Sequence, residues 1–219
     1  VKVLGSEDTV GSVSAIGAVS PPGGDLSEPV SQATLRIVKV FWGLSSSLAY
    51  KRHFPAIDWL ISYSLYADRM ADWYSQKVGA DFVRLRAFIM NVLQEEANLD
   101  EIVRLVGVDA LSYKDRMTLE TAKMVREDYL HQNAFHEVDT YTSLDKQYRM
   151  LKLIKKFHDL GIEAVNNYAE LDDILAIPAK EKIGRAKYIE ESAIGTFDEI
   201  SNELETEMRA LISGGRNDE

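Results

Sequence analysis

The chain has 219 residues, of which 46% are hydrophobic, so it is long enough for one large domain or two small ones with a buried core. The absence of cysteine excludes a disulfide framework, a thiolate zinc site and a cysteine nucleophile. Acidic residues outnumber basic ones, 35 to 25, and the formal net charge of -10 repels a phosphate backbone, so we expect no nucleic-acid partner.

The chain opens on Val1–Leu4, a strand-like sequence without an initiator Met, and we expect it to be part of a longer protein. Its apolar stretches are far shorter than the roughly 20 residues of a membrane-spanning helix. The small, uncharged residues Ser12–Ser20 predict a strand buried on both faces. The prolines and glycines of Pro21–Pro29 then predict a loop with an acidic tip.

A second buried strand is predicted over Leu35–Trp42, which is rich in β-branched and aromatic residues. The serines Ser45–Ser47 then offer an N-cap for a short helix. This alternation of strand, loop, strand and helix is typical of an α/β domain.

Helical periodicity replaces the strand pattern from about Tyr66 onward. Asp81 is expected to cap one helix, Gly107 to end the next, and Ser112 to cap a third. Further apolar stripes are carried by Leu144, Tyr148, Leu151 and Ile154, and by Phe197, Ile200, Leu204, Met208 and Leu211 behind a capping box of Thr196 and Glu199. The predicted fold class is therefore mainly α, a C-terminal helical bundle preceded by the last strands of an α/β domain.

No catalytic or metal motif is complete in this chain. A phosphate-binding loop needs Gly-x-x-x-x-Gly-Lys-Ser/Thr, and the sequence contains no Gly-Lys pair. His136-Glu137 begins like a metalloprotease helix, but Thr140 stands where the second histidine is needed, so we expect no metal site. Glu199, Glu203 and Glu207 share one helical face, which favours a solvated surface over an acid–base pair.

Three aromatic residues leave two interpretations open. Phe54 precedes Pro55, and Tyr129 and Phe135 bracket the polar segment His131–Asn133. Periodicity alone favours core packing for such rings. A stacking pocket for a nucleobase is the alternative.

Four segments, taken together, resemble the catalytic A subunits of the archaeal and vacuolar rotary ATPases. They are residues 17–30 (GAVSPPGGDLSEPV), 40–44 (VFWGL), 51–66 (KRHFPAIDWLISYSLY) and 129–141 (YLHQNAFHEVDTY), and they run in the family's order over nearly the whole chain. The loop at Pro21–Pro29 favours the A subunits over the non-catalytic B subunits, and FHEVDTY is more similar to archaeal than to eukaryotic members.

The resemblance implies that residues 1–65 are the C-terminal remnant of a RecA-like α/β nucleotide-binding domain and that residues 66–219 form the C-terminal helical bundle. The family's phosphate-binding loop and catalytic acids precede Val1. It follows that the complete subunit binds ATP or ADP with Mg²⁺, whereas this chain alone is expected to be inactive and to bind no nucleotide tightly.

Two groups of site residues carry over from the family. The adenine would be held by Phe54, Phe135 and Tyr129. The central stalk would be contacted by the loop with Asp25 and Glu28, and by the helix–turn–helix tip with Asp109, Tyr113 and Lys114. F-type relatives have a strongly acidic tip at the second place, so here a steric lever is expected rather than an electrostatic one, and an ordinary surface turn is the alternative.

The expected partners are B subunits alternating with A subunits in a ring, together with the central stalk. The complex would translocate protons or sodium ions and lie peripherally on the cytoplasmic face of the cell membrane. A free-standing helical module that binds a protein partner is the competing hypothesis.

Overall fold

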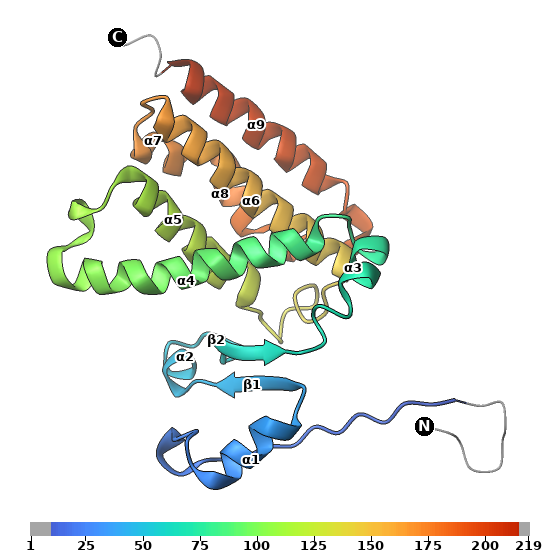
Figure 1. Ribbon diagram of the computed structural model, residues 1–219. Helices are drawn as coiled ribbons and strands as arrows, with labels where there is room; N and C mark the ends of the chain where they lie inside the picture. Colours follow the sequence, from blue (N-terminus) through green and yellow to red (C-terminus); the bar gives the residue numbers. More distant parts are fainter. Residues whose placement is uncertain (1–9, 215–219) are drawn as a thin grey trace. The chain divides into compact units, whose positions relative to one another are not determined.

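The structure is a computed structural model, which describes residues 10–214 (Figure 1). The predicted strand-like start Val1–Leu4 lies outside the described residues. The chain divides into two compact units, Val1–Phe41 and Trp42–Glu219, and each is described by itself.

The first unit contains a short 3₁₀ turn, η1 (Pro22–Gly24), and helix α1 (Pro29–Ile37). The unit boundary falls inside strand β1 (Val40–Leu44). The strand predicted over Ser12–Ser20 is wrong, because this stretch has no regular secondary structure and is exposed throughout. A strand must pair its backbone with at least one neighbouring strand, and the described residues provide none here.

The second predicted strand, Leu35–Trp42, is also corrected. Helix α1 occupies its first three residues, and β1 begins only at Val40. The reason is a strong helix start: the Glu28 side chain accepts hydrogen bonds from the backbone N–H groups of Val30 and Ser31, and Pro29 stands in the first turn. This start prevails over the β propensity of the residues that follow.

The second unit pairs β1 with β2 (Ile57–Ser64) in a two-stranded sheet. Between the strands lies α2 (Ser46–Tyr50), whose N-cap Ser45 accepts a hydrogen bond from Leu48 N at 3.3 Å. The predicted short helix is therefore confirmed. The helices that follow are α3 (Ala71–Lys77), α4 (Phe82–Val106), η2 (Val108–Ala110), α5 (Tyr113–Met124), the π-helical turn η3 (Val125–Leu130), α6 (Leu144–Asn166), α7 (Leu171–Ala176), α8 (Pro178–Gly184), η4 (Ala186–Tyr188), η5 (Glu191–Ala193) and α9 (Thr196–Gly214).

Helix α6 is the centre of the bundle and packs against α4, α5, α8 and α9 (Figure 1). Its Phe157 and Ile154 are fully buried, as are Leu204 and Met208 on α9 and Met117 on α5. The predicted helical bundle and the mainly α fold class are thus confirmed. Of the predicted stripe on α9, only Leu211 is not fully buried, because Ile212 takes the core position instead.

Helix α4 corrects another prediction, since the two helices expected between Asp81 and Gly107 are one helix of 25 residues. Neither Gly nor Pro occurs between Phe82 and Val106 to interrupt it. Asp81 occupies the N-cap position without a capping bond, because its carboxylate accepts a hydrogen bond from the Tyr148 hydroxyl at 2.5 Å. Among the described helices, none combines the length and hydrophobicity needed to cross a membrane.

Candidate functional site

Two hydrogen bonds join the segment that carries Phe54 to the C-terminal end of the α5–η3 helix and the segment just after it. The backbone N–H of Gln132 donates to the carbonyl of Phe54 at 2.7 Å. One residue earlier, Nε2 of His53 donates to the carbonyl of Arg126 at 2.8 Å. Two of the four segments on which the resemblance rests, residues 51–66 and 129–141, therefore meet in space although they are distant in sequence.

Arg126 is itself held in place by an acidic residue of α4. Its Nε donates to both carboxylate oxygens of Glu96, at 2.9 and 3.1 Å. Burial raises the pKa of Glu96, and the neighbouring Arg126 works in the opposite direction. These hydrogen bonds hold Arg126 in place at the end of the helix, and the Arg126 carbonyl is the group that accepts the hydrogen bond from His53.

His53 lies in a small cluster of rings. Its centroid is 5.5 Å from that of Trp59 and 5.3 Å from that of His131. In the described part of the chain, Nδ1 of His53 is buried without a hydrogen-bond partner. Burial lowers the pKa of His131, and the positive charge of Lys187 and the neighbouring His53 lower it further. The surroundings therefore favour the neutral form of the His131 imidazole.

Hydrogen bonds within the loop after Gln132 hold it in place, and Phe135 on this loop is exposed to solvent. The buried carboxylate of Asp139 accepts a hydrogen bond from Asn133 N at 2.6 Å. Gln132 Nε2 donates to the carbonyl of Asp139, also at 2.6 Å, and Phe135 N donates to Asn133 Oδ1 at 3.0 Å. Sequence reasoning missed the role of Asp139, for which the only signal was the cluster of turn-forming Asn and Asp residues.

The three predicted adenine residues have different surroundings. The side chain of Phe54 is 50% exposed and that of Phe135 is 100% exposed. No ring contact joins these two within residues 10–214, although the Gln132–Phe54 bond brings their segments together. Tyr129 is half-buried against the core and lines an apolar cavity of about 370 Å³ with Trp59 and Tyr74. Burial raises the pKa of its hydroxyl to about 12.

The two acidic residues of the predicted stalk loop take part in local structure of the first unit. Asp25 accepts a hydrogen bond from Ser27 N at 2.9 Å, and Glu28 caps α1. Hydrogen bonds from Ser27 and Ser31 lower the pKa of Asp25 and Glu28, respectively. Both carboxylates are therefore ionised near neutral pH. They give the loop negative charge, and the hydrogen bonds they accept also stabilise its conformation.

The predicted helix–turn–helix tip connects α4 through η2 to α5. Asp109 lies in η2 and Lys114 is exposed at the start of α5. The Tyr113 hydroxyl donates to Glu170 at 3.3 Å. Large apolar side chains are exposed here, including Leu105 (83%), Val106 (62%), Ile102 (45%) and Val108 (42%).

The exposed side chains Ile102, Leu105 and Val106 lie in the last turns of α4, before Gly107. The residues follow the helical period but extend beyond the helices that could cover them, so periodicity alone could not reveal their exposure. In residues 10–214, no three His, Cys, Asp or Glu side chains are grouped so that they could hold a metal ion.

Two family models match this chain, one up to the end of β2 and the other from α3 onward. Residues 71–175 match the family model of the C-terminal domain of V and A type ATP synthase. Residues 3–64 match the model of the ATP synthase alpha/beta family, nucleotide-binding domain. Among solved structures, an ATP synthase subunit, NeqB, from Nanoarcheaum equitans is similar in fold, with a TM-score of 0.53 and 23% identity over 63% of this chain and 32% of that chain.

Curated relatives are much more similar in sequence. The V-type ATP synthase alpha chain of Acetivibrio thermocellus is 62% identical over 97% of this chain, and alpha chain 1 of Clostridium tetani is 61% identical over 97%. The chain spans 36% of the length of each of these two relatives. The resemblance stated from the four segments is confirmed: the chain belongs to the family of V- and A-type ATP synthase alpha chains and includes their C-terminal domain.

Proposed function

We propose that this chain is part of the catalytic subunit of a rotary ATP synthase that translocates protons or sodium ions. Residues 1–65 would belong to the nucleotide-binding domain, and residues 66–219 would form the helical domain that acts on the central stalk. Identity of about 60% to V-type ATP synthase alpha chains over nearly the whole chain supports this proposal.

The chain would contribute the adenine side of the nucleotide site. The hydrogen bond from Gln132 N to the carbonyl of Phe54 is the observation that carries this proposal, because it holds the segments of Phe54 and Phe135 together. Both rings are exposed, and an exposed aromatic face can stack on a purine. Tyr129, which packs against the core of the helical bundle, would support the adenine site from the side of that bundle.

The rest of the nucleotide would be held by other parts of the subunit. Aromatic side chains fit an adenine, but the sequence has no Gly-Lys pair to bind the β- and γ-phosphates. The bound ATP and Mg²⁺ would supply the phosphoryl chemistry. We therefore expect no Mg²⁺-dependent ATP hydrolysis by the 219-residue chain alone in a coupled assay.

The tip between α4 and α5 would act as the lever on the stalk. Its exposed side chains Leu105 and Val106 favour an apolar contact, and Tyr113 and Lys114 stand where F-type relatives carry acids. The loop with Asp25 and Glu28 would make a second stalk contact. The subunit would alternate with B subunits in a ring peripheral to the cytoplasmic face of the membrane.

The adenine site is tested by titrating ADP into the assembled complex. Phe54→Ala and Phe135→Ala should each raise the Kd for ADP roughly fivefold or more, since stacking of a base on an aromatic ring contributes about 1–3 kcal/mol. Tyr50→Ala is the matched control, because Tyr50 is 89% exposed on the neighbouring helix α2. Unchanged affinity in both phenylalanine variants would remove these rings from the site.

A further inference from the structure

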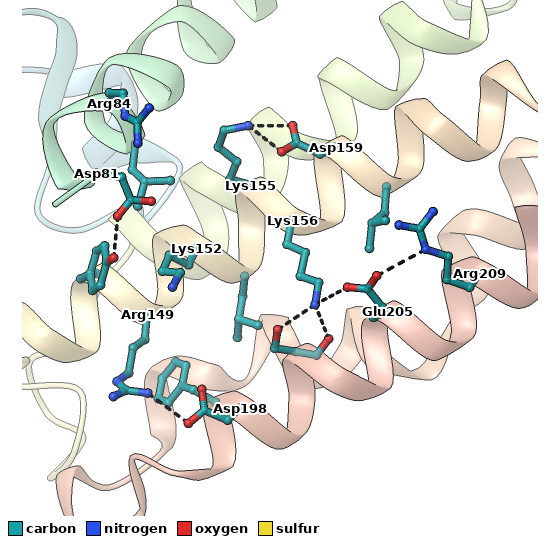
Figure 2. Close-up of a pocket in the computed structure, with 16 residues that line it drawn as sticks. Asp81, Arg84, Arg149, Lys152, Lys155, Lys156, Asp159, Asp198, Glu205 and Arg209 are labelled. Atoms are coloured by element: carbon teal, nitrogen blue, oxygen red, sulfur yellow. Dashed lines mark hydrogen bonds and ion pairs between the residues drawn. The ribbon is translucent and has the colours of Figure 1, made fainter. Parts of the chain in front are cut away.

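A charged groove of about 720 Å³ is formed by α6, α9 and the start of α4 (Figure 2). Buried side chains of the core, among them Leu153 and Phe197, contribute apolar surface to it. The volume lies within the range of roughly 300–1,000 Å³ typical of small-molecule sites. The groove therefore has room for a ligand larger than a single ion.

The charges of the groove differ in sign from those of the chain. Acidic residues exceed basic ones by ten in the whole sequence, 35 against 25. The groove instead carries six basic and four acidic side chains. The basic ones are Arg84, Arg149, Lys152, Lys155, Lys156 and Arg209, and the acidic ones are Asp81, Asp159, Asp198 and Glu205.

Four of the six cations already have carboxylate partners. The contacts are Lys155 with Asp159 at 2.6 Å, Lys156 with Glu205 at 2.7 Å, Arg209 with Glu163 at 2.6 Å, and Arg149 with Asp145 at 3.1 Å and Asp198 at 3.5 Å. These pairs hold the charged walls of the groove in place.

Arg84 and Lys152 differ from the other four. Among the described residues neither has an ion-pair partner, and in Figure 2 they are the labelled cations without a dashed line. Asp81, three residues before Arg84, is engaged by the Tyr148 hydroxyl at 2.5 Å. Lys152 Nζ lies over the ring of the same Tyr148, 5.3 Å from its centroid. The groove is thus lined by two cations, Arg84 and Lys152, that have no carboxylate partner in the described part of the chain.

We propose that the α4–α6–α9 groove binds a compact anion bearing two or more phosphate groups, with Arg84 and Lys152 as its principal contacts. A guanidinium can bind two phosphate oxygens at once, and an ammonium adds a point charge with three donors. The acids of the groove are already occupied by other partners, so they need not move to admit the anion. This inference rests on the groove alone and does not depend on the proposed function.

The test is calorimetric titration of pyrophosphate into the 219-residue chain at low ionic strength. The double variant Arg84→Gln/Lys152→Gln should raise the Kd at least about tenfold, and salt at about 0.15 M should weaken binding to the parent chain. Arg104→Gln is the matched control, since Arg104 is an exposed arginine of the same helix that does not line the groove. Both substituted side chains are exposed, and circular dichroism verifies the fold.

A second arm distinguishes free phosphates from lipid headgroups, using vesicles with a phosphomonoester lipid and vesicles of neutral lipid alone. Binding that is lost in the double variant supports the site in either arm, and the arm in which it occurs identifies the source. Equal Kd values for parent and double variant would overturn the proposal. So would an equal loss in Arg104→Gln, because it would indicate unspecific attraction. If the double variant does not fold, each single variant is judged by the same criteria.

Discussion

At the scale of single residues, Asp128 is an unusual carboxylate in the π-helical turn that leads to the proposed adenine segment. Burial raises its pKa from 3.8 to about 6, and the positive charge of Lys187 only partly opposes this effect. In the described part of the chain, no hydrogen bond to its carboxylate is found. Its ionised form therefore destabilises the fold.

Asp128→Asn should raise the free energy of unfolding by about 1–2 kcal/mol near pH 8, a figure already reduced for solvent screening, and should change it little near pH 4. Below its unfolded pKa of 3.8 the carboxyl is neutral in both states, and the fold has its full stability. As the pH rises from there through about 6, the free energy of unfolding falls, because burial disfavours the charged form. The amide has no such dependence. Urea unfolding at the two pH values measures the difference, with the exposed Asp172→Asn as control. A gain of equal size at both pH values would contradict this explanation.

Gly79 is required by a close approach rather than by its backbone conformation. A Cβ atom at this position would lie 2.3 Å from Cζ of Tyr148, whose hydroxyl is bound to Asp81. Gly79→Ala should therefore lower the free energy of unfolding by about 1–3 kcal/mol, because the ring must move. Gly195→Ala has no atom within 4 Å of the added Cβ and is the control. Equal stabilities of the two variants in thermal or urea unfolding would show that the ring adapts freely.

At the scale of elements, the sequence predicted helices better than strands. Capping residues such as Ser45 and Ser112 act locally, so they marked the starts of α2 and α5 correctly. A strand depends on partners distant in the chain, and Ser12–Ser20 has an apolar composition without such partners in the described structure. The uninterrupted length of α4 was missed because its apolar stripe fades toward Ile102, where the helix leaves the core.

Ser112 provides a test of these local signals. Its hydroxyl oxygen accepts the backbone N–H of Asp115 at 3.2 Å, so Ser112→Ala should lower the free energy of unfolding by about 1 kcal/mol. Thr206 lies in the interior of α9 and bonds back to the carbonyl of Asn202, so Thr206→Ala should be neutral or slightly stabilising. Chemical unfolding of both variants measures the contrast. A larger loss in the α9 variant would mean that capping does not control the start of α5.

At the scale of the whole molecule, the candidate site depends on a contact that periodicity could not predict. Phe54 and Gln132 lie in two loops that are far apart in the sequence, and their backbone hydrogen bond shows that the segments meet. The resemblance had paired Phe54 with Phe135 in advance, whereas residue patterns alone favoured core packing for both. Their exposures of 50% and 100% show that neither ring is a core residue.

Photolabelling tests the adenine site most directly. The assembled complex would be irradiated with an azido-adenine nucleotide, and the labelled peptides would be mapped by mass spectrometry. We predict that label on this chain is concentrated in the peptides that contain Phe54 and Phe135, and that an excess of ADP abolishes it. Label confined to other peptides of the complex, with these two unmodified, would contradict the proposal that the two rings hold the adenine.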